Sequence, residues 1–479
     1  MLAQIKRLGG DSLLYALMNV GTKLIAFIML PIYTRFLPDP AEYGVLDYVD
    51  RLSAMLTFLV IFGTDSALAY YYYDTKDEDK RIKYVQQVMS FRLAIVVICA
   101  LVFILGGEWL SNLLLETPNA VHLLYIAAGI LLFDTIAALV LTVMRYQFKT
   151  MKVVIFTVLK MFLVAVLSYA LLATIMTSVE GILIGRIISG ILIVILLLPN
   201  LRKFFSFNIN KEILKEILKY AAPLVPASLA FWVIVNSNVI FLKEYTSFTE
   251  VGLYGTAVKF ASLITLLTSG VQMAWRPYSM SIKDKQDSQV VFGKLYMAIL
   301  LIGTLGVLFV ATIMPWVIKL LDKNYWEAYK YVAPISAVTF LNFYYMIISV
   351  GIFFKKKTKY ISIAFGIAAI VNVLLNVILI PQLSIWGSVI AYLLSYVVAI
   401  VLIFFRSQKE YHVPVSFWKM SFIFINMLIA VAGIIYTQES QLSWIYILLA
   451  WGYFLITTRL SRVDKDILGK HQKAMNSDV

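Results

Sequence analysis

The sequence predicts an all-α integral membrane protein with fourteen transmembrane helices, and three observations carry this prediction. The 479 residues are 61% hydrophobic and 14% charged, whereas soluble domains are about 45–50% apolar and about 25% charged. The mean hydropathy is +0.85. The apolar residues come in blocks of about 20, which is long enough for a helix to cross the hydrocarbon core.

The predicted spans follow one another with short polar segments between them. They cover residues 12–34, 52–73, 86–106, 120–144, 153–175, 179–199, 218–242, 253–275, 292–315, 328–353, 359–381, 384–405, 416–436 and 443–460. The segment from Arg35 to Arg51 is expected to form a polar hairpin on the outer side. The first apolar block is full length, so it is expected to be an uncleaved span and not a signal peptide.

The basic residues alternate with the predicted spans. With a cytoplasmic N-terminus, 30 of the 41 Lys and Arg residues fall in inner segments, 6 in outer segments and 5 within spans. This bias predicts an even number of spans and two cytoplasmic termini. It also explains the net charge of +14 by cytoplasmic loops, so no nucleic acid partner is expected.

Several classes of site are excluded by the residues that are missing. Cys99 is the one cysteine, so the chain has no internal disulfide and no cysteine metal site. The three histidines, His122, His412 and His471, are scattered along the chain and make no metal set. A Gly-x-x-x-x-Gly-Lys-Ser/Thr loop is also missing. Because no soluble block is long enough for a catalytic domain, we expect a transporter and not an enzyme, with no cofactor.

The two halves of the chain carry related motifs. Glu250-Val251-Gly252 repeats the pattern of Glu42-Tyr43-Gly44 at an offset of 208 residues, and the same offset relates Arg51 to Lys259. We expect an N-lobe of six spans (1–199), a cytoplasmic linker with an amphipathic helix on the inner leaflet (200–217, its helix starting near Asn208), a C-lobe of six spans (218–406), and two C-terminal spans with a cytoplasmic tail (407–479). Parallel lobes of this kind place a substrate path between them.

Lys23 lies at the middle of the first span, where a charge costs about 2.5–3.5 kcal/mol on insertion scales unless water or a partner meets it. Asn19 and Tyr15 share its helical face. Lys23 is therefore expected either to line a wet cavity or to pair with Asp65 or Asp134. The two carboxylates are themselves interpreted as counter-ions or, alternatively, as a protonatable coupling site.

Other polar residues within the spans allow two interpretations each. Arg186 and Lys259 lie nearer the outer side and either line the cavity or form ion pairs. Arg51, at the outer mouth of the second span, is a cavity or an interface residue. Asn236 is an interhelical hydrogen-bond partner or a ligand contact. Arg92 and Lys160 are expected to extend to the cytoplasmic interface.

The five basic residues within the spans outnumber Asp65 and Asp134. A cation exporter needs carboxylates that face its substrate, whereas a phosphate group needs Lys and Arg, and Arg binds phosphate in a bidentate way. The charge balance therefore favours an anionic substrate.

Two motifs carry a family resemblance. Residues 30–37 (Leu-Pro-Ile-Tyr-Thr-Arg-Phe-Leu) with 42–44 (Glu-Tyr-Gly), and residues 63–67 (Gly-Thr-Asp-Ser-Ala) with Tyr70 to Tyr73, resemble the polysaccharide-transport branch of the multidrug/oligosaccharidyl-lipid/polysaccharide exporter superfamily. That branch includes O-antigen and related lipid-linked oligosaccharide flippases. The resemblance implies a V-shaped, MATE-like bundle of two lobes, a cationic central cavity and alternating access. The cavity arginines of the related lipid II flippases have no secure match here.

The expected function is a flippase for an undecaprenyl-diphosphate-linked oligosaccharide in the bacterial plasma membrane. Its substrate-binding residues would be Lys23, Arg51, Arg186, Lys259, Asn19 and Asn236. Transport would draw on a Na+ or H+ gradient, the membrane potential or downstream consumption of the substrate. The expected partners are membrane lipids and the glycan polymerase and glycosyltransferases of the same pathway. Three alternatives stay open: a cation-coupled drug exporter that depends on Asp65 and Asp134, a lipid II-type flippase, and a scaffold that transports nothing.

Overall fold

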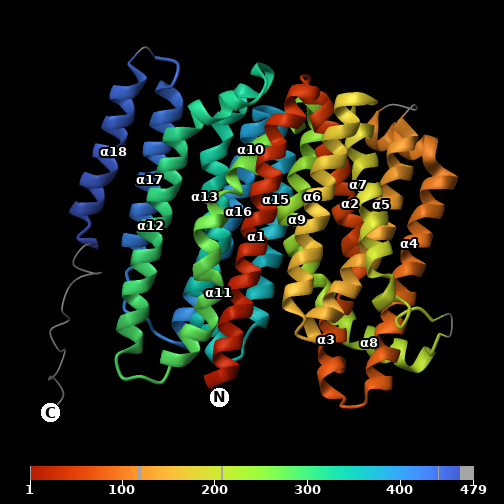
Figure 1. The fold of residues 1–479 in the computed structure, drawn as a ribbon. Helices are drawn as coiled ribbons and strands as arrows, with labels where there is room; N and C mark the ends of the chain where they lie inside the picture. Colours follow the sequence, from red (N-terminus) through yellow and green to blue (C-terminus); the bar gives the residue numbers. More distant parts are fainter. Residues whose placement is uncertain (1, 117–119, 207–208, 441, 464–479) are drawn as a thin grey trace. The chain divides into compact units, whose positions relative to one another are not determined.

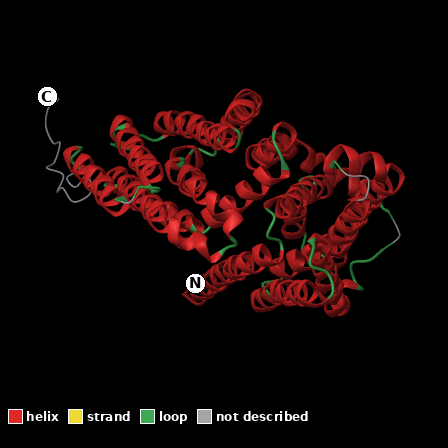
Figure 2. Cartoon of the chain, turned by 90° about the horizontal axis from the view of Figure 1, so that it is seen from above, coloured by secondary structure: helices red, strands yellow, loops and turns green. Residues whose placement is uncertain are grey.

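The computed structural model describes residues 2–116, 120–206, 209–440 and 442–463. Within these ranges every regular element is a helix, and Figure 2 draws only helices, loops and turns there. Asn208 and residues 464–479 of the expected cytoplasmic tail lie outside the described residues.

The described residues of the first half of the chain form eight α-helices, which are labelled in Figure 1. They are α1 (Leu2–Phe36), α2 (Pro40–Ile61), α3 (Thr64–Asp74), α4 (Glu78–Leu115), α5 (Val121–Tyr146), α6 (Thr150–Thr174), α7 (Val179–Leu201) and α8 (Lys211–Ala221).

Ten α-helices and three short 3-10 helices are formed by the residues of the second half that the structure describes. They are η2 (Ala222–Leu224), α9 (Val225–Tyr245), α10 (Phe248–Ala261), α11 (Ile264–Ile282), α12 (Ser288–Val317), η3 (Ile318–Leu320), η4 (Lys323–Ala328), α13 (Tyr329–Ile348), α14 (Val350–Phe354), α15 (Lys359–Leu383), α16 (Ile385–Glu410), α17 (Phe417–Thr437) and α18 (Ser443–Leu460).

The helices are long and apolar enough to confirm the predicted fold class. Among the described residues, 12 helical segments could cross a membrane by length and composition. Two further segments are helix pairs bent by 59° and 44°, namely Lys211–Leu224 with Ser228–Tyr245, and Phe248–Ala261 with Ile264–Arg276. Counting each bent pair as one span gives 14, the predicted number.

The start of the second span differs from the sequence prediction. Helix α2 begins at Pro40, because the Asp39 carboxylate caps it by accepting the Ala41 N–H at 2.9 Å and proline suits the first helical position. Most of the expected polar hairpin is therefore helical, and the predicted start at residue 52 is wrong. As a result, Asp47 and Asp50 belong to the same helix as Arg51.

The second span is broken where α2 meets α3. Phe62 and Gly63 adopt left-handed conformations, with φ of 43° and 71°. A Cβ atom on Gly63 would lie 2.9 Å from the Ala221 carbonyl oxygen, so glycine serves both the turn and the close approach of α8. Helix α3 begins directly after this break, at the buried residue Thr64, and its first turn contains Asp65.

The described helices form two compact units. The first contains Met1–Thr256, Leu321–Tyr325 and Val373–Ser388, and the second contains Ala257–Leu320, Trp326–Asn372 and Val389–Val479. A core in the first unit gathers buried residues from α3, α4, α5, α7 and α8. The expected six-span lobes describe a repeat along the sequence, and their boundaries stay a prediction.

The amphipathic helix expected after the sixth span is present as α8. Asn210 caps it by accepting the N–H groups of Glu212 and Ile213. Its apolar face packs on α3 and α4, where Ile217 is fully buried. The Tyr84 hydroxyl of α4 also donates to Glu216 Oε2 at 3.0 Å. Protein therefore covers the apolar side of this helix, which was expected to rest on the lipid leaflet.

The two copies of the repeated motif touch each other within the first unit. A Cβ atom on Gly44 would lie 1.8 Å from the Phe248 carbonyl oxygen, and one on Gly252 would lie 1.9 Å from the Pro40 carbonyl oxygen. Pro40 and Phe248 are separated by the same 208 residues as the two glycines. Helices α2 and α10 thus cross reciprocally, as repeats related by a two-fold axis would, and only glycine allows this approach.

Candidate functional site

An arginine–carboxylate pair joins α7 to α2 in the first unit. The Arg186 guanidinium binds Asp50 through both of its terminal nitrogens, with Nη1 facing Oδ1 and Nη2 donating to Oδ2 at 3.3 Å. The two side chains are 22% and 28% exposed. This planar, two-point geometry is the one that a guanidinium also uses for phosphate.

Arg51 forms a second contact from α2, directed at α9. Its Nε lies 3.4 Å from Asp47 Oδ2, one turn earlier on the same helix. Its Nη1 donates to Asn236 Oδ1 at 3.2 Å, and the Asn236 amide in turn donates to the Trp232 carbonyl at 3.1 Å. The Asp47 carboxylate is only 2% exposed. Arg51 and Asn236, both expected site residues, are therefore in direct contact.

Polar side chains continue from this point into α10 and α15. Asn238 donates to the Tyr254 hydroxyl at 3.2 Å, and Asn376 donates to Asn238 Oδ1 at 2.8 Å. The Ser384 hydroxyl donates to Glu250 Oε2 at 2.5 Å. These bonds connect α9, α10 and the end of α15, so the helices around Arg51 are held by buried hydrogen bonds.

The two acids singled out from the sequence, Asp65 and Asp134, form separate ion pairs. Arg92 donates to Asp65 Oδ1 at 2.6 Å, and its Nη2 and Nε reach the Thr64 hydroxyl at 2.7 and 3.0 Å. Lys160 donates to Asp134 Oδ1 at 2.6 Å. The Arg92 side chain is 2% exposed, because the break before α3 offers it two oxygen acceptors. Arg92 and Lys160 thus bind carboxylates, in contrast to the expected extension toward the interface.

The remaining expected site residues lie on α1 and α10. Lys23 is half-buried on α1, which packs along α6, and Asn19 is exposed one turn earlier. The Asn19 carbonyl accepts a bond from Thr22 at 3.1 Å. Lys259 belongs to the second unit, where it is partly buried near the end of α10. The structure joins Arg51 of α2 with Asn236, and Arg186 of α7 binds Asp50 of the same helix α2. Lys23 and Lys259 are located on other elements.

Asp47 and Asp50 were missed because they were assigned to an outer loop. The signal was available: Asp39-Pro40 is a helix start, and Asp47 stands four residues before Arg51. With these two acids counted, each of four bases has a carboxylate partner; the pairs are Arg51 with Asp47, Arg92 with Asp65, Lys160 with Asp134, and Arg186 with Asp50.

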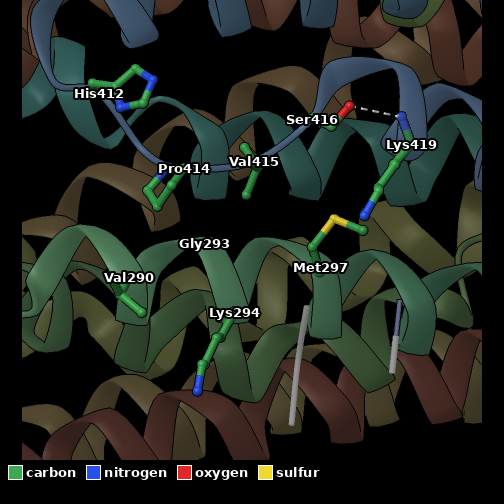
Figure 3. A pocket seen from close by; sticks show the side chains of 9 residues that line it. All are labelled: Val290, Gly293, Lys294, Met297, His412, Pro414, Val415, Ser416 and Lys419. Atoms are coloured by element: carbon green, nitrogen blue, oxygen red, sulfur yellow. Dashed lines mark hydrogen bonds between the residues drawn. The ribbon is translucent and has the colours of Figure 1, made fainter. Parts of the chain in front are cut away.

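A cavity with basic side chains lies in the second unit, between α12 and the connection into α17 (Figure 3). It has a volume of about 410 Å³, and Lys294, Lys419 and His412 are among its lining residues. In Figure 3 the Lys419 side chain reaches toward Met297, whereas Lys294 points away from the connection. The Lys294 and Lys419 ammonium groups point in different directions, so they do not converge on a single ligand position in this cavity.

Known proteins match both the sequence and the fold. A family model described as polysaccharide biosynthesis protein matches residues 8–283, which is more than half of the chain. The chain therefore belongs to this family, in the polysaccharide branch of the multidrug/oligosaccharidyl-lipid/polysaccharide exporter (MOP) superfamily. No curated protein matches the sequence significantly.

Solved structures show the same fold at low sequence identity. The lipid II flippase MurJ in an inward closed conformation is similar with a TM-score of 0.71 and 17% identity, over 94% of this chain and 99% of that one. An outward-facing multidrug resistance MATE family transporter of the MOP superfamily is similar with a TM-score of 0.57 and 17% identity, over 84% and 95% of the two chains. The protein is thus a multi-pass membrane protein with the fold of flippases and transporters.

Proposed function

We propose that this protein is a flippase that moves an undecaprenyl-diphosphate-linked oligosaccharide from the cytoplasmic to the outer leaflet of the bacterial plasma membrane. One observation carries the proposal: two arginines from different helices, Arg51 of α2 and Arg186 of α7, both bind carboxylates of the membrane-spanning helix α2 in a protein of a polysaccharide biosynthesis family. Each is held by a carboxylate on that helix.

A diphosphate would bind by replacing a carboxylate at one of the two arginines. Without substrate, Asp47 and Asp50 neutralise the two arginines, which avoids the cost of an unpaired charge at membrane depth. An entering diphosphate offers oxygens in the same bidentate arrangement and can take the place of a carboxylate. The lipid tail stays in the bilayer, and Lys23, Asn19 and Asn236 of the first unit supply further polar groups for the substrate. Lys259, which belongs to the second unit, is proposed as an additional substrate-binding residue.

The remaining features of the proposal follow from this transport step. Translocation breaks no covalent bond, so we assign the protein no enzymatic activity. We assign both termini to the cytoplasm from the distribution of Lys and Arg. A Na+ or H+ gradient, the membrane potential or consumption of the product would drive the cycle. The glycosyltransferases that build the oligosaccharide and the polymerase that extends it would act before and after the flippase.

The test is a transport assay in proteoliposomes. A fluorescent undecaprenyl-diphosphate-linked oligosaccharide is placed in one leaflet, and its arrival in the other is followed by quenching. The wild type should move the lipid. Variants Arg51→Gln and Arg186→Gln should move it at least tenfold more slowly, whereas Lys76→Gln, in the connection before α4, should not differ from the wild type. Equal rates for all four proteins, or no transport by the wild type, would refute the proposal.

The drug exporter is distinguished by its dependence on the acids. Asp65 and Asp134 are bound to Arg92 and Lys160, so neutralising either acid leaves a base without its carboxylate. A cation-coupled exporter requires Asp65→Asn and Asp134→Asn to abolish transport while Arg186→Gln retains it. Loss of the protein would then make cells drug sensitive.

The lipid II flippase alternative rests on the shared fold with MurJ. Offering fluorescent lipid II to the same proteoliposomes separates it from the proposed substrate, because both lipids carry the diphosphate and differ in the sugar. A scaffold would transport neither lipid.

A further inference from the structure

A groove on the second unit runs between α15 and α16 and has both an apolar and a basic part. Its volume is about 280 Å³. It is lined by Tyr360, Ile363, Ala364, Ile367, Leu402, Phe405, Arg406 and Lys409. None of these residues belongs to the charged pairs of the first unit.

The apolar part of the groove is open to the surroundings. Ile363 and Phe405 are 53% and 50% exposed, and Ile367 and Leu402 are 41% and 37% exposed. They lie on helices that are long and apolar enough to span a membrane. Exposed aliphatic side chains on such helices face lipid chains, so this part of the groove fits an acyl chain.

The basic part of the groove is formed by Arg406 and Lys409. The Arg406 guanidinium stacks on the Tyr360 ring at 3.7 Å from its centre, and its Nη2 donates to Glu410 Oε1 at 2.5 Å. These two contacts fix the guanidinium plane. The Arg406 side chain is 30% exposed, so a phosphate oxygen can approach the guanidinium from outside.

The charge around this end of the groove is strongly positive. Residues 355–359 include Lys355, Lys356, Lys357 and Lys359, whereas Glu410 is the one acid in residues 353–360 and 402–410. Glu410 is already shared, since Lys357 reaches its Oε2 at 2.8 Å and Arg406 its Oε1. The positive-inside distribution assigns this end to the cytoplasmic leaflet, where basic pockets between spans attract acidic lipid headgroups.

We propose that this groove binds an acidic phospholipid of the inner leaflet. Its phosphate contacts Arg406 and Lys409, and one acyl chain lies along Ile363, Ile367 and Phe405. None of the residues that line the groove is assigned to substrate binding, and its proposed occupant is a resident lipid and not the transported one.

The test measures lipid binding directly, without transport. The full-length protein in neutral detergent is titrated with short-chain phosphatidylglycerol or phosphatidylcholine, and bound lipid is counted by native mass spectrometry. The wild type should bind phosphatidylglycerol at least tenfold more tightly than phosphatidylcholine. The double variant Arg406→Gln/Lys409→Gln should lose this preference, whereas a control with the same charge change, Lys283→Gln/Lys285→Gln, should keep it.

A second variant tests the acyl-chain part and protects against misfolding. Because Ile363 is more than half exposed, Ile363→Trp fills the groove without disturbing the core and should weaken phosphatidylglycerol binding at least fivefold. Inorganic phosphate should not compete at millimolar concentration. Full competition by phosphate together with unchanged binding by Ile363→Trp would identify a free-anion site and overturn the lipid proposal. Equal affinity for the two phospholipids would overturn it as well.

Discussion

Substitutions in the Arg186–Asp50 ion pair test whether Arg186 binds the diphosphate of the proposed substrate. Replacing either residue breaks the pair, but the two changes have opposite consequences for a diphosphate. Arg186→Gln removes the group proposed to bind the phosphate. Asp50→Asn removes the carboxylate that competes with it, and leaves the guanidinium available to the substrate.

The size of each effect follows from burial and geometry. Breaking a fully buried pair costs about 3–5 kcal/mol. The Arg186 and Asp50 side chains are 22% and 28% exposed, so we expect a smaller loss of stability, of about 1–3 kcal/mol, for either single variant. A hydrogen bond to a charged group contributes about 1.5–3 kcal/mol, so Arg186→Gln should weaken substrate binding roughly 10- to 100-fold.

The assay measures stability and transport for one set of variants that includes a charge exchange. Thermal unfolding in detergent and flipping of the fluorescent lipid-linked oligosaccharide are measured for the wild type, both single variants and the exchange Asp50→Arg/Arg186→Asp. The exchange restores opposite charges on α2 and α7, so it should recover most of the lost stability. Transport should stay low, because the arginine now extends from the wrong helix.

One result would refute this reasoning. If the exchanged protein transports at the wild-type rate, the pair serves only to connect α2 with α7, and Arg186 has no direct role in binding substrate. Tighter substrate binding by Asp50→Asn is the second expectation, and weaker binding would argue against the proposed exchange of carboxylate for phosphate.

Three further predictions concern other positions in the spanning helices. Gly44→Ala places a methyl group 1.8 Å from the Phe248 carbonyl oxygen. It should therefore lower the free energy of unfolding by about 1–3 kcal/mol or more, measured by thermal unfolding. The control Gly366→Ala adds a methyl group that meets no atom within 4 Å, so it should be neutral. Lys23→Ala should insert normally, as judged by surface labelling, but stop translocation, and full transport would exclude a role for Lys23. Arg92→Gln removes the charge-assisted hydrogen bond from Arg92 to Asp65 and should lower the free energy of unfolding by about 1–3 kcal/mol. An unchanged melting temperature would show that this pair contributes nothing to stability.

Features that lie along one helix could be predicted from the sequence. The positions of the spans follow from the lengths of the apolar blocks, and α12, α17 and α18 each begin and end within a few residues of prediction. The helix after the sixth span follows from its alternating Lys, Glu and Ile residues. The family motifs lie in the first 73 residues, within the region that the family model matches.

The start of α2 could not be predicted from hydropathy. Glu42, Asp47, Asp50 and Arg51 make the segment look like a loop, because hydropathy treats each charge as an isolated cost. In the folded protein Asp50 and Arg51 meet Arg186 and Asn236 on other helices, and the cost of burying them falls once they are paired. Hydropathy contains no information about such partners.

A polytopic helical membrane protein with basic residues inside its spans could be predicted from the sequence, because length, apolarity and charge are properties of contiguous residues. Three features became known from the folded protein: which base binds which acid, that the repeated glycines Gly44 and Gly252 cross at backbone contact, and that protein covers the apolar face of α8. These outcomes depend on which faces of separate helices come together, and residues far apart in the chain set them jointly.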